Sequence, residues 1–171
     1  MSYLYDGWLK ISEGFNGDRR FEILEDQEAA GALVEDRGGK LLLVRQYRVA
    51  LGQETLEIPA GCLDKDGLSP VEIMVEELAE EANLIVEGKD LDLLLVGQPN
   101  IGVSKSRYFL YHYRYPGVGQ DEKITDDPDV TERLWVTSED FLRLIQEGGI
   151  TDMKSQLAFF LWKSKLDGRP R

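Results

Sequence analysis

The chain has 171 residues, a hydrophobic fraction of 42% and a formal net charge of −12, which suits one globular domain with a sizeable core. The acidic balance excludes a nucleic-acid coat and a membrane-surface protein, because both need a basic face. Cys62 is the single cysteine and His112 the single histidine, which excludes an intramolecular disulfide and disfavours a Cys/His zinc site. With no long apolar run and no signal peptide at its start, the chain is expected to be cytoplasmic.

The first part of the chain has the pattern of strands. Residues 8–11 and 20–24 are partly alternating and flank a turn-rich stretch at 14–18, which predicts a β-hairpin within about residues 1–27. His112 falls in an aromatic run, where a structural strand position is favoured over a place in a Ser-His-Asp triad. Further strands are expected at 29–34, 40–45, 93–96, 108–113 and 134–136.

Three helices follow from their start and stop signals. The first has Ser69 as N-cap, Pro70 at its first position and Glu72 completing a capping box, and Asn83 could end it. The second runs from Thr137 or Ser138 to about 146, and the third from about 152 to 166. Strands with interspersed helices predict an α/β (α+β) fold with a mixed sheet.

The first helix carries an unusual group of carboxylates. On a helical wheel, an apolar stripe centred on Val71 is flanked on one side by Glu77, Glu80 and Glu81, with Ile73 among them. Two unit charges 4 Å apart repel by about 4 kcal/mol at an effective dielectric near 20. A hard divalent cation would turn this repulsion into attraction, so the helix is either a metal site or an acidic surface helix.

The segments 56–61 and 62–84 resemble the Nudix hydrolases, whose box is G-x5-E-x7-R-E-U-x-E-E-x-G-U with U apolar. Residues 76–84 read E-E-L-A-E-E-A-N-L, so the E-U-x-E-E part is intact. Residues 41–48 and 56–61 look like the L-L-V-x-Q-x-R and L-E-x-P-A-G segments of the nucleoside-diphosphate-sugar branch. An acidic stretch before Trp135 resembles a later loop of the same branch.

The box also departs from the family pattern. Glu76 replaces the arginine, Asn83 replaces the glycine, and the early glutamate is absent from the region of Gly67 and Leu68. The family arginine helps to hold its neighbouring glutamates, so that help must come from elsewhere in this chain.

The resemblance implies one Nudix domain over residues 1–171, an α/β/α sandwich with a central mixed sheet. It implies hydrolysis of the diphosphate of a nucleoside diphosphate sugar to a nucleoside monophosphate and a sugar phosphate, with Mg²⁺ or Mn²⁺. Glu77 and Glu81 would be direct ligands, Glu80 a ligand or water-orienting base, and the carbonyl of Ala60 would face the metal.

The general base of this branch is often a loop carboxylate. Asp129 is the closest match, and Asp126, Asp127 and Glu132 are the other candidates. The alternative is a solvated acidic loop.

Arg48 is the first choice for a diphosphate contact and Arg45 the second, because arginine binds phosphate with a charged fork. The alternative is a surface arginine paired with acid. Glu57, Ser104 and Arg107 complete the expected substrate-binding set. Residues 104–107 replace the S-x-E of many ADP-ribose enzymes, and from Gly102 the sequence looks more like the G-x-x-x-S-R of UDP-sugar enzymes.

The resemblance also implies a homodimer that pairs through the N-terminal strands, with a small-molecule nucleotide sugar as partner and neither nucleic acid nor membrane. Three other functions stay open. The chain could be a Nudix hydrolase of another diphosphate, a degenerate Nudix domain that binds a nucleotide ligand without cutting it, or a structural acidic domain.

Overall fold

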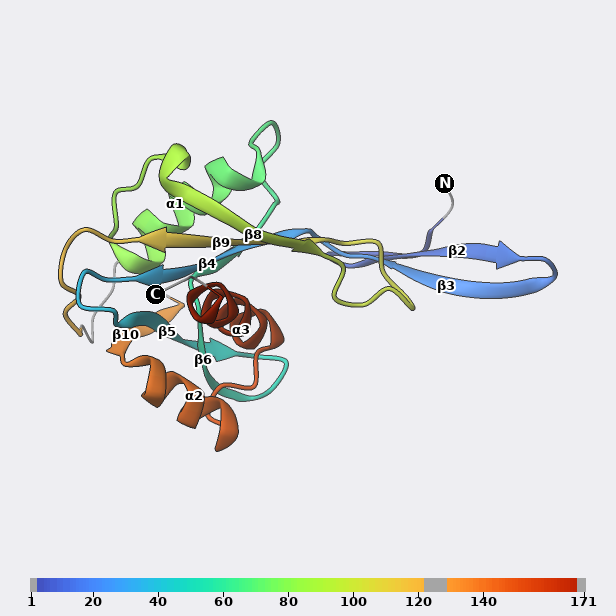
Figure 1. The fold of residues 1–171 in the computed structure, drawn as a ribbon. Coiled ribbons are helices and arrows are strands. Elements are labelled where there is room, and N and C mark those ends of the chain that lie inside the picture. Colours follow the sequence, from blue (N-terminus) through green and yellow to red (C-terminus); the bar gives the residue numbers. More distant parts are fainter. Residues whose placement is uncertain (1–2, 122–128, 169–171) are drawn as a thin grey trace.

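The central element of the protein is a mixed sheet covered by helices on both faces (Figure 1). The computed structural model describes residues 3–121 and 129–168. Within these residues the sheet has seven strands in the order β10-β5-β4-β9-β8, with β6 paired to β5 and β7 paired to β4. The strands are β4 (Ala29–Glu35), β5 (Leu41–Arg48), β6 (Gln53–Glu57), β7 (Ala60–Cys62), β8 (Leu91–Gly97), β9 (Tyr108–Arg114) and β10 (Val130–Val136).

Strand β4 lies at the centre and accounts for the mixed character of the sheet. It pairs in parallel with β9 and antiparallel with β5 and β7. Its side chains alternate between the two faces: Ala30, Ala32 and Val34 belong to one core cluster and Leu33 to the other. A strand buried on both faces has no polar side, which explains why residues 29–34 form a continuous apolar run.

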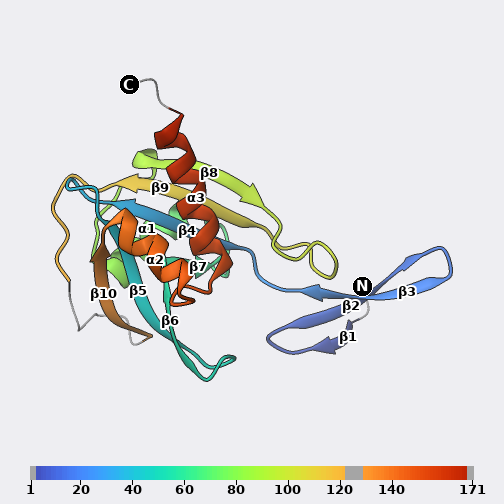
Figure 2. The ribbon, with the colours of Figure 1, turned by 60° about the horizontal axis from the view of Figure 1, so that its bottom comes forward.

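Helix α1 (Pro70–Ala82) covers one face, and α2 (Ser138–Gln146) and α3 (Met153–Asp167) cover the other (Figures 1 and 2). Met74 and Leu78 of α1 pack in the first cluster, whereas Phe141 of α2 and Phe159 of α3 pack in the second. The rings of Phe141 and Phe159 stack with centroids 4.7 Å apart. The predicted α/β/α sandwich with a central mixed sheet is confirmed.

The predicted boundaries of α1 are also confirmed. The Ser69 hydroxyl accepts from the Glu72 backbone N–H, and the Glu72 carboxylate accepts from the Ser69 N–H at 2.8 Å. Asn83 ends the helix in the left-handed conformation, with φ 54°, which asparagine tolerates better than most residues. Local chemistry therefore fixes where this helix begins and ends.

The buried face of α1 differs from the predicted stripe. Ile73 and Glu81 are buried, whereas Val71 and Val75 are only half-buried. On the helical wheel Ile73 lies among the glutamates, beside the apolar stripe and not within it, yet its side chain is fully buried. The reason is that α1 contacts both β4 and β7, so it is covered from two sides and not along a single stripe.

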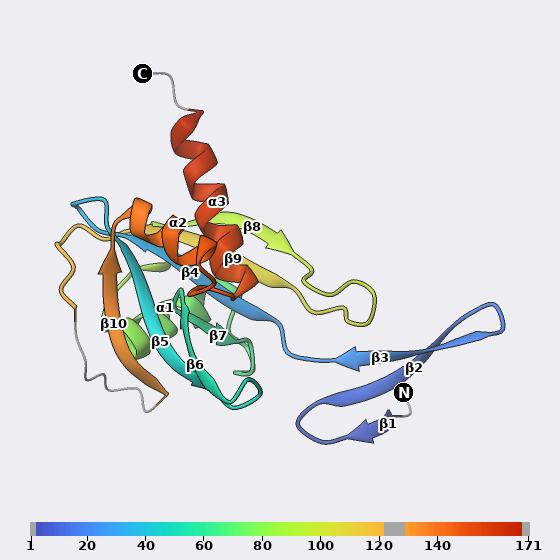
Figure 3. The same cartoon turned by 90° about the horizontal axis from the view of Figure 1, so that it is seen from below.

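An N-terminal sheet projects from this body (Figures 1 and 3). It consists of β1 (Tyr3–Asp6), β2 (Lys10–Asn16) and β3 (Arg19–Glu25) in the order β1-β2-β3. The turn between β2 and β3 is shorter than the predicted 14–18, because residues 14–16 continue the ladder with β3. The Leu24 N–H donates to the Val103 carbonyl at 2.8 Å, which ties the sheet to the segment before β9.

A short 3₁₀ helix, η1 (Gly88–Asp90), connects α1 to β8. No helix among the described residues is both long and apolar enough to cross a membrane.

Candidate active site

A cavity of about 660 Å³ opens between α1, β7 and the end of β5. It brings together residues that the sequence places far apart. Its lining includes Glu77, Glu80, Glu81, Ala60, Arg48 and Asp129. The predicted metal ligands, the first-choice arginine and one candidate base thus share a single space.

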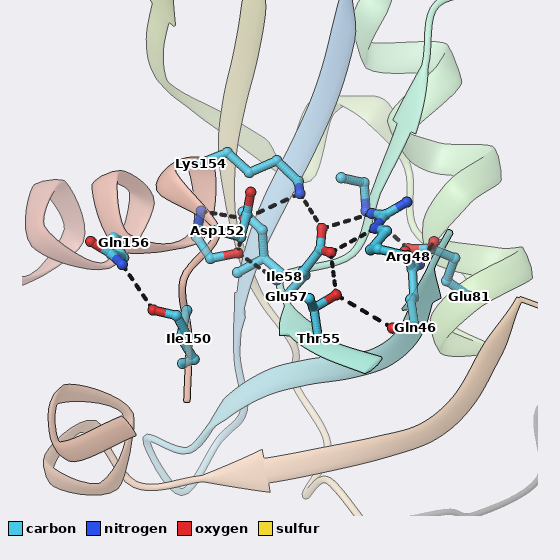
Figure 4. Close-up of polar contacts among 12 residues, drawn as sticks. Gln46, Arg48, Thr55, Glu57, Ile58, Glu81, Ile150, Asp152, Lys154 and Gln156 are labelled. Carbon is cyan, nitrogen blue, oxygen red and sulfur yellow. Dashed lines mark hydrogen bonds and ion pairs between the residues drawn. The ribbon is translucent and has the colours of Figure 1, made fainter. Parts of the chain in front are cut away.

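Glu81 is the most firmly held of the three glutamates. Glu81 is only 4% exposed, and the Ala60 backbone N–H donates to its Oε2 at 2.9 Å. Gln46 on β5 donates its amide to the other oxygen, Oε1 (Figure 4). A buried carboxylate is stable only when its oxygens are bonded, so Gln46 and Ala60 fix the position of Glu81. Gln46 is the glutamine of the L-L-V-x-Q-x-R segment, but its contact with Glu81 was not among the predicted site contacts.

Glu77 is accommodated by a glycine. A Cβ at Gly61 would lie 2.0 Å from Glu77 Oε1 and 2.6 Å from its Cγ. A side chain at the third residue of the P-A-G segment would therefore displace the Glu77 carboxylate from the space that it occupies.

Glu80 is exposed and faces a lysine that the sequence analysis did not select. The Lys65 ammonium lies 2.6 Å from Glu76 Oε2 and 3.5 Å from Glu80 Oε1. Lys65 belongs to the loop between β7 and α1, and its pKa is raised first by the hydrogen bond to Glu76 and further by the Glu80 charge.

The carboxylates of Glu77, Glu80 and Glu81 are oxygen donors of the type that suits a hard divalent cation. Within residues 3–121 and 129–168, however, no three Asp, Glu, His or Cys side chains are arranged to hold a metal ion. The contacts explain why: Glu80 is turned to Lys65, and both oxygens of Glu81 accept from protein N–H groups. Glu80 is exposed and lies three residues from Glu77, so the two side chains are neighbours on the helix surface.

A second cavity, of about 670 Å³, adjoins the first and shares Arg48, Ala60 and Gly61 with it. On its wall, Arg48 holds Glu57 with two hydrogen bonds of 2.7 Å, from Nε to Oε1 and from Nη2 to Oε2 (Figure 4). Lys154, from the first turn of α3, also donates to Glu57 and lies 3.1 Å from Asp152. The sequence analysis missed Lys154, because only the packing of α3 on the sheet brings it to β6.

The charges of this network are balanced in a largely buried setting. Burial raises the pKa of Glu57, but the bonds from Arg48, Lys154 and Thr55 outweigh it and hold that pKa at about 2. The bond to Glu57 raises the pKa of Arg48 in turn. Glu57 thus occupies two nitrogens of the Arg48 fork, and the half-exposed guanidinium still lines both cavities.

The remaining predicted residues divide into two groups. Asp129 lines the first cavity, directly before β10. Glu132 lies within β10 and not in a loop, because the strand begins at Val130, and it is paired with Arg45 at 2.8 Å. Asp126 and Asp127 lie outside the described residues.

Ser104 and Arg107 line neither of the two cavities. The Ser104 hydroxyl bonds to Asp26, and Arg107 pairs with Glu28. Both contacts connect the segment before β9 to the residues between β3 and β4. Ser104 also lines a smaller cavity beside Phe21 of β3.

The NUDIX domain model matches residues 25–155 of this sequence, a span that contains both cavities and every glutamate of the first. The chain belongs to the Nudix family.

Two curated proteins are similar to this Nudix chain. It is 28% identical over 137 residues to the ADP-ribose pyrophosphatase of Bacillus subtilis (strain 168), a match that covers 80% of this chain and 72% of that protein. It is 26% identical, with the same coverage, to the methanol dehydrogenase activator of Bacillus methanolicus. A solved structure titled as an ADP compounds hydrolase has a TM-score of 0.75 and 17% identity, and covers 98% of this chain and 91% of that one. The protein is a Nudix hydrolase.

Two other reactive side chains of this Nudix hydrolase are not placed for catalysis. His112 is buried in β9 with its Nε2 3.1 Å from Glu35, and burial lowers its pKa. Cys62 lines both cavities, but desolvation and the nearby charges of Asp64 and Glu77 raise the pKa of its thiol, which disfavours the nucleophilic thiolate.

Proposed function

We propose that this Nudix hydrolase cleaves the diphosphate bond of a nucleoside diphosphate sugar and releases a nucleoside monophosphate and a sugar phosphate. The observation that carries the proposal is the cavity shared by Glu77, Glu80, Glu81 and Arg48. It joins an anionic wall suited to a cation with a guanidinium suited to a phosphate.

The proposed roles follow from how firmly each group is held. Glu77, Glu81 and the Ala60 carbonyl would hold Mg²⁺ or Mn²⁺, which when bound neutralises phosphoryl charge and lowers the pKa of a water. Arg48, fixed by Glu57, orients the diphosphate with its remaining N–H groups. A preset donor lowers the entropic cost of reaching the reactive geometry.

The proton of the attacking water needs a carboxylate that is close to the cavity yet able to move. Glu80 fits because it is exposed and loosely paired at 3.5 Å, and Asp129 is the second candidate because it lines the same cavity. Glu132 is the weaker choice, since its ion pair with Arg45 holds it on β10.

The substrate class is supported by the two kinds of similarity together. The curated ADP-ribose pyrophosphatase is named for a nucleoside diphosphate sugar, and the structural neighbour is titled for ADP compounds. We therefore propose ADP-ribose as the first substrate to test, with UDP-glucose and GDP-mannose as alternatives from the same class.

The experiment is a cleavage assay of these three compounds, with Mg²⁺, with Mn²⁺ and with EDTA. Glu81→Gln and the exposed Glu80→Gln are compared with wild type, and Glu139→Gln on α2 is the matched control, because Glu139 lines none of the described cavities. Metal-dependent cleavage that both site variants lose and the control retains supports the proposal. Saturable nucleotide binding with no product would favour the degenerate Nudix domain that binds a nucleotide without cutting it. If the protein neither cleaves nor binds these compounds, both functions are refuted.

We also propose that residues 1–171 form one domain with an N-terminal extension, and that two copies pair through it. The projecting sheet leaves Trp8 73% and Phe15 66% exposed, and apolar surface of this kind marks interfaces. Sedimentation at micromolar concentration tests this, since a monomer would contradict it.

A further inference from the structure

Helix α1 carries its acidic residues without a basic residue of its own. The residues from Pro70 to Ala82 contain five glutamates and neither lysine nor arginine, although Glu76 and Glu80, like Glu77 and Glu81, are one turn apart. Like charges at this spacing destabilise a helix. A cation from another element would offset the repulsion between Glu76 and Glu80.

Lys65 is that cation. Its ammonium reaches α1 from the loop after β7, 2.6 Å from Glu76 and 3.5 Å from Glu80, and it lines the same cavity as Glu77, Glu80 and Glu81. The two distances are unequal: Glu76 binds the ammonium closely, and Glu80 only loosely. Glu76 is thus the anchor, and Glu80 is the partner that can be exchanged.

We infer that Lys65, anchored by Glu76, is a positioning residue. It pairs with Glu80 in the absence of a divalent cation and releases the Glu80 carboxylate when a cation binds. The arginine expected at the position of Glu76 is thus replaced by a reversed pair, with the acid on the helix and the base on the loop. This inference rests on the proposed function, because it concerns the cation of the same cavity.

The arrangement makes two substitutions act in opposite directions on cation affinity. Without the ammonium, Glu80 has no competing partner and the cavity loses one positive charge, so a cation binds more tightly. Without the Glu76 carboxylate, Lys65 has only Glu80 to pair with, so a cation must compete harder and binds more weakly.

The test is Mg²⁺ titration of the full chain by calorimetry, without substrate. We expect Lys65→Met to lower the dissociation constant about fivefold and Glu76→Gln to raise it about fivefold, the effect of one unit charge at short range near water. Lys89→Met and Glu87→Gln are matched controls, because Lys89 and Glu87 form an exposed pair of the same 2.6 Å length that lines none of the described cavities. Neither control should change the constant by more than about twofold.

The double variant Lys65→Met with Glu76→Gln separates pairing from net charge. If Glu76 acts through Lys65, the added Glu76→Gln leaves the dissociation constant of Lys65→Met unchanged, whereas independent charge effects would raise it about fivefold. Unchanged affinity in Lys65→Met, or control variants that shift as much as the site variants, overturns the inference while the wild type still cleaves substrate. A wild type that binds no Mg²⁺ overturns both the inference and the metal-dependent function.

Discussion

Replacing Glu57 by glutamine tests how the second cavity is held together. Glu57 is 4% exposed and accepts two bonds of 2.7 Å from Arg48, one of 2.7 Å from Thr55 and one from Lys154. Its pKa of about 2 lies well below the ordinary value of 4.5. At about 1.4 kcal/mol per pKa unit, this difference contributes about 3 kcal/mol to the free energy of unfolding.

The sign of the pH dependence follows from the lowered pKa. The folded protein binds a proton at Glu57 less readily than the unfolded chain, so the stabilisation is fully present above pH 4.5 and disappears as the pH falls to about 2. We expect the wild type to be more stable than Glu57→Gln by about 3 kcal/mol at pH 7, and by only about 1 kcal/mol at pH 3.

Urea denaturation of both proteins from pH 7 to pH 3, in EDTA, measures this difference. Glu87→Gln is the control, since its exposed partner Lys89 makes a surface pair worth roughly 0–1 kcal/mol. A stability difference between wild type and Glu57→Gln that stays constant over this range would refute the reasoning, because it would show that the ionised form of Glu57 has no special role.

Three further substitutions probe other contacts. Gly61→Ala places a Cβ where the Glu77 carboxylate lies, so Mg²⁺ affinity by calorimetry should fall at least about tenfold; unchanged affinity would remove Glu77 from the ligand set. Arg48→Lys keeps the charge but loses the paired bonds to Glu57, so kcat/KM should fall about tenfold or more, and a wild-type value would mean that Arg48 does not orient the diphosphate. Phe159→Ala removes a ring that is 0% exposed and stacked on Phe141, so urea denaturation should show a loss of about 3–5 kcal/mol; a loss below about 1 kcal/mol would contradict the close packing of α3.

The sequence alone determined the elements whose causes are local. The ends of α1 follow from Ser69, Glu72 and Asn83, whose side chains and backbone act within one turn of the helix. The limits of α2 and α3 follow in the same way from Thr137 and Asp152 as N-caps. Motif order was enough to predict the family, because the spacing of the glutamates is itself the signal.

Only the tertiary structure decided which charged groups meet. Glu81 is buried because β7 and β5 supply Ala60 and Gln46 to it, and no helical wheel contains those strands. Arg48 pairs with Glu57, and Glu57 also accepts a hydrogen bond from Lys154, which lies 97 residues after Glu57 in the sequence. Strand β10 begins early, at Val130, because it pairs with β5, and this removes Glu132 from the predicted loop.

Electrostatic partners of this kind depend on distances of a few ångströms between distant segments. Local propensity and periodicity carry no information about those distances. The sequence therefore determined where this Nudix hydrolase has its glutamate helix, and the packing of β5, β6, β7 and α3 decided what holds each glutamate in place.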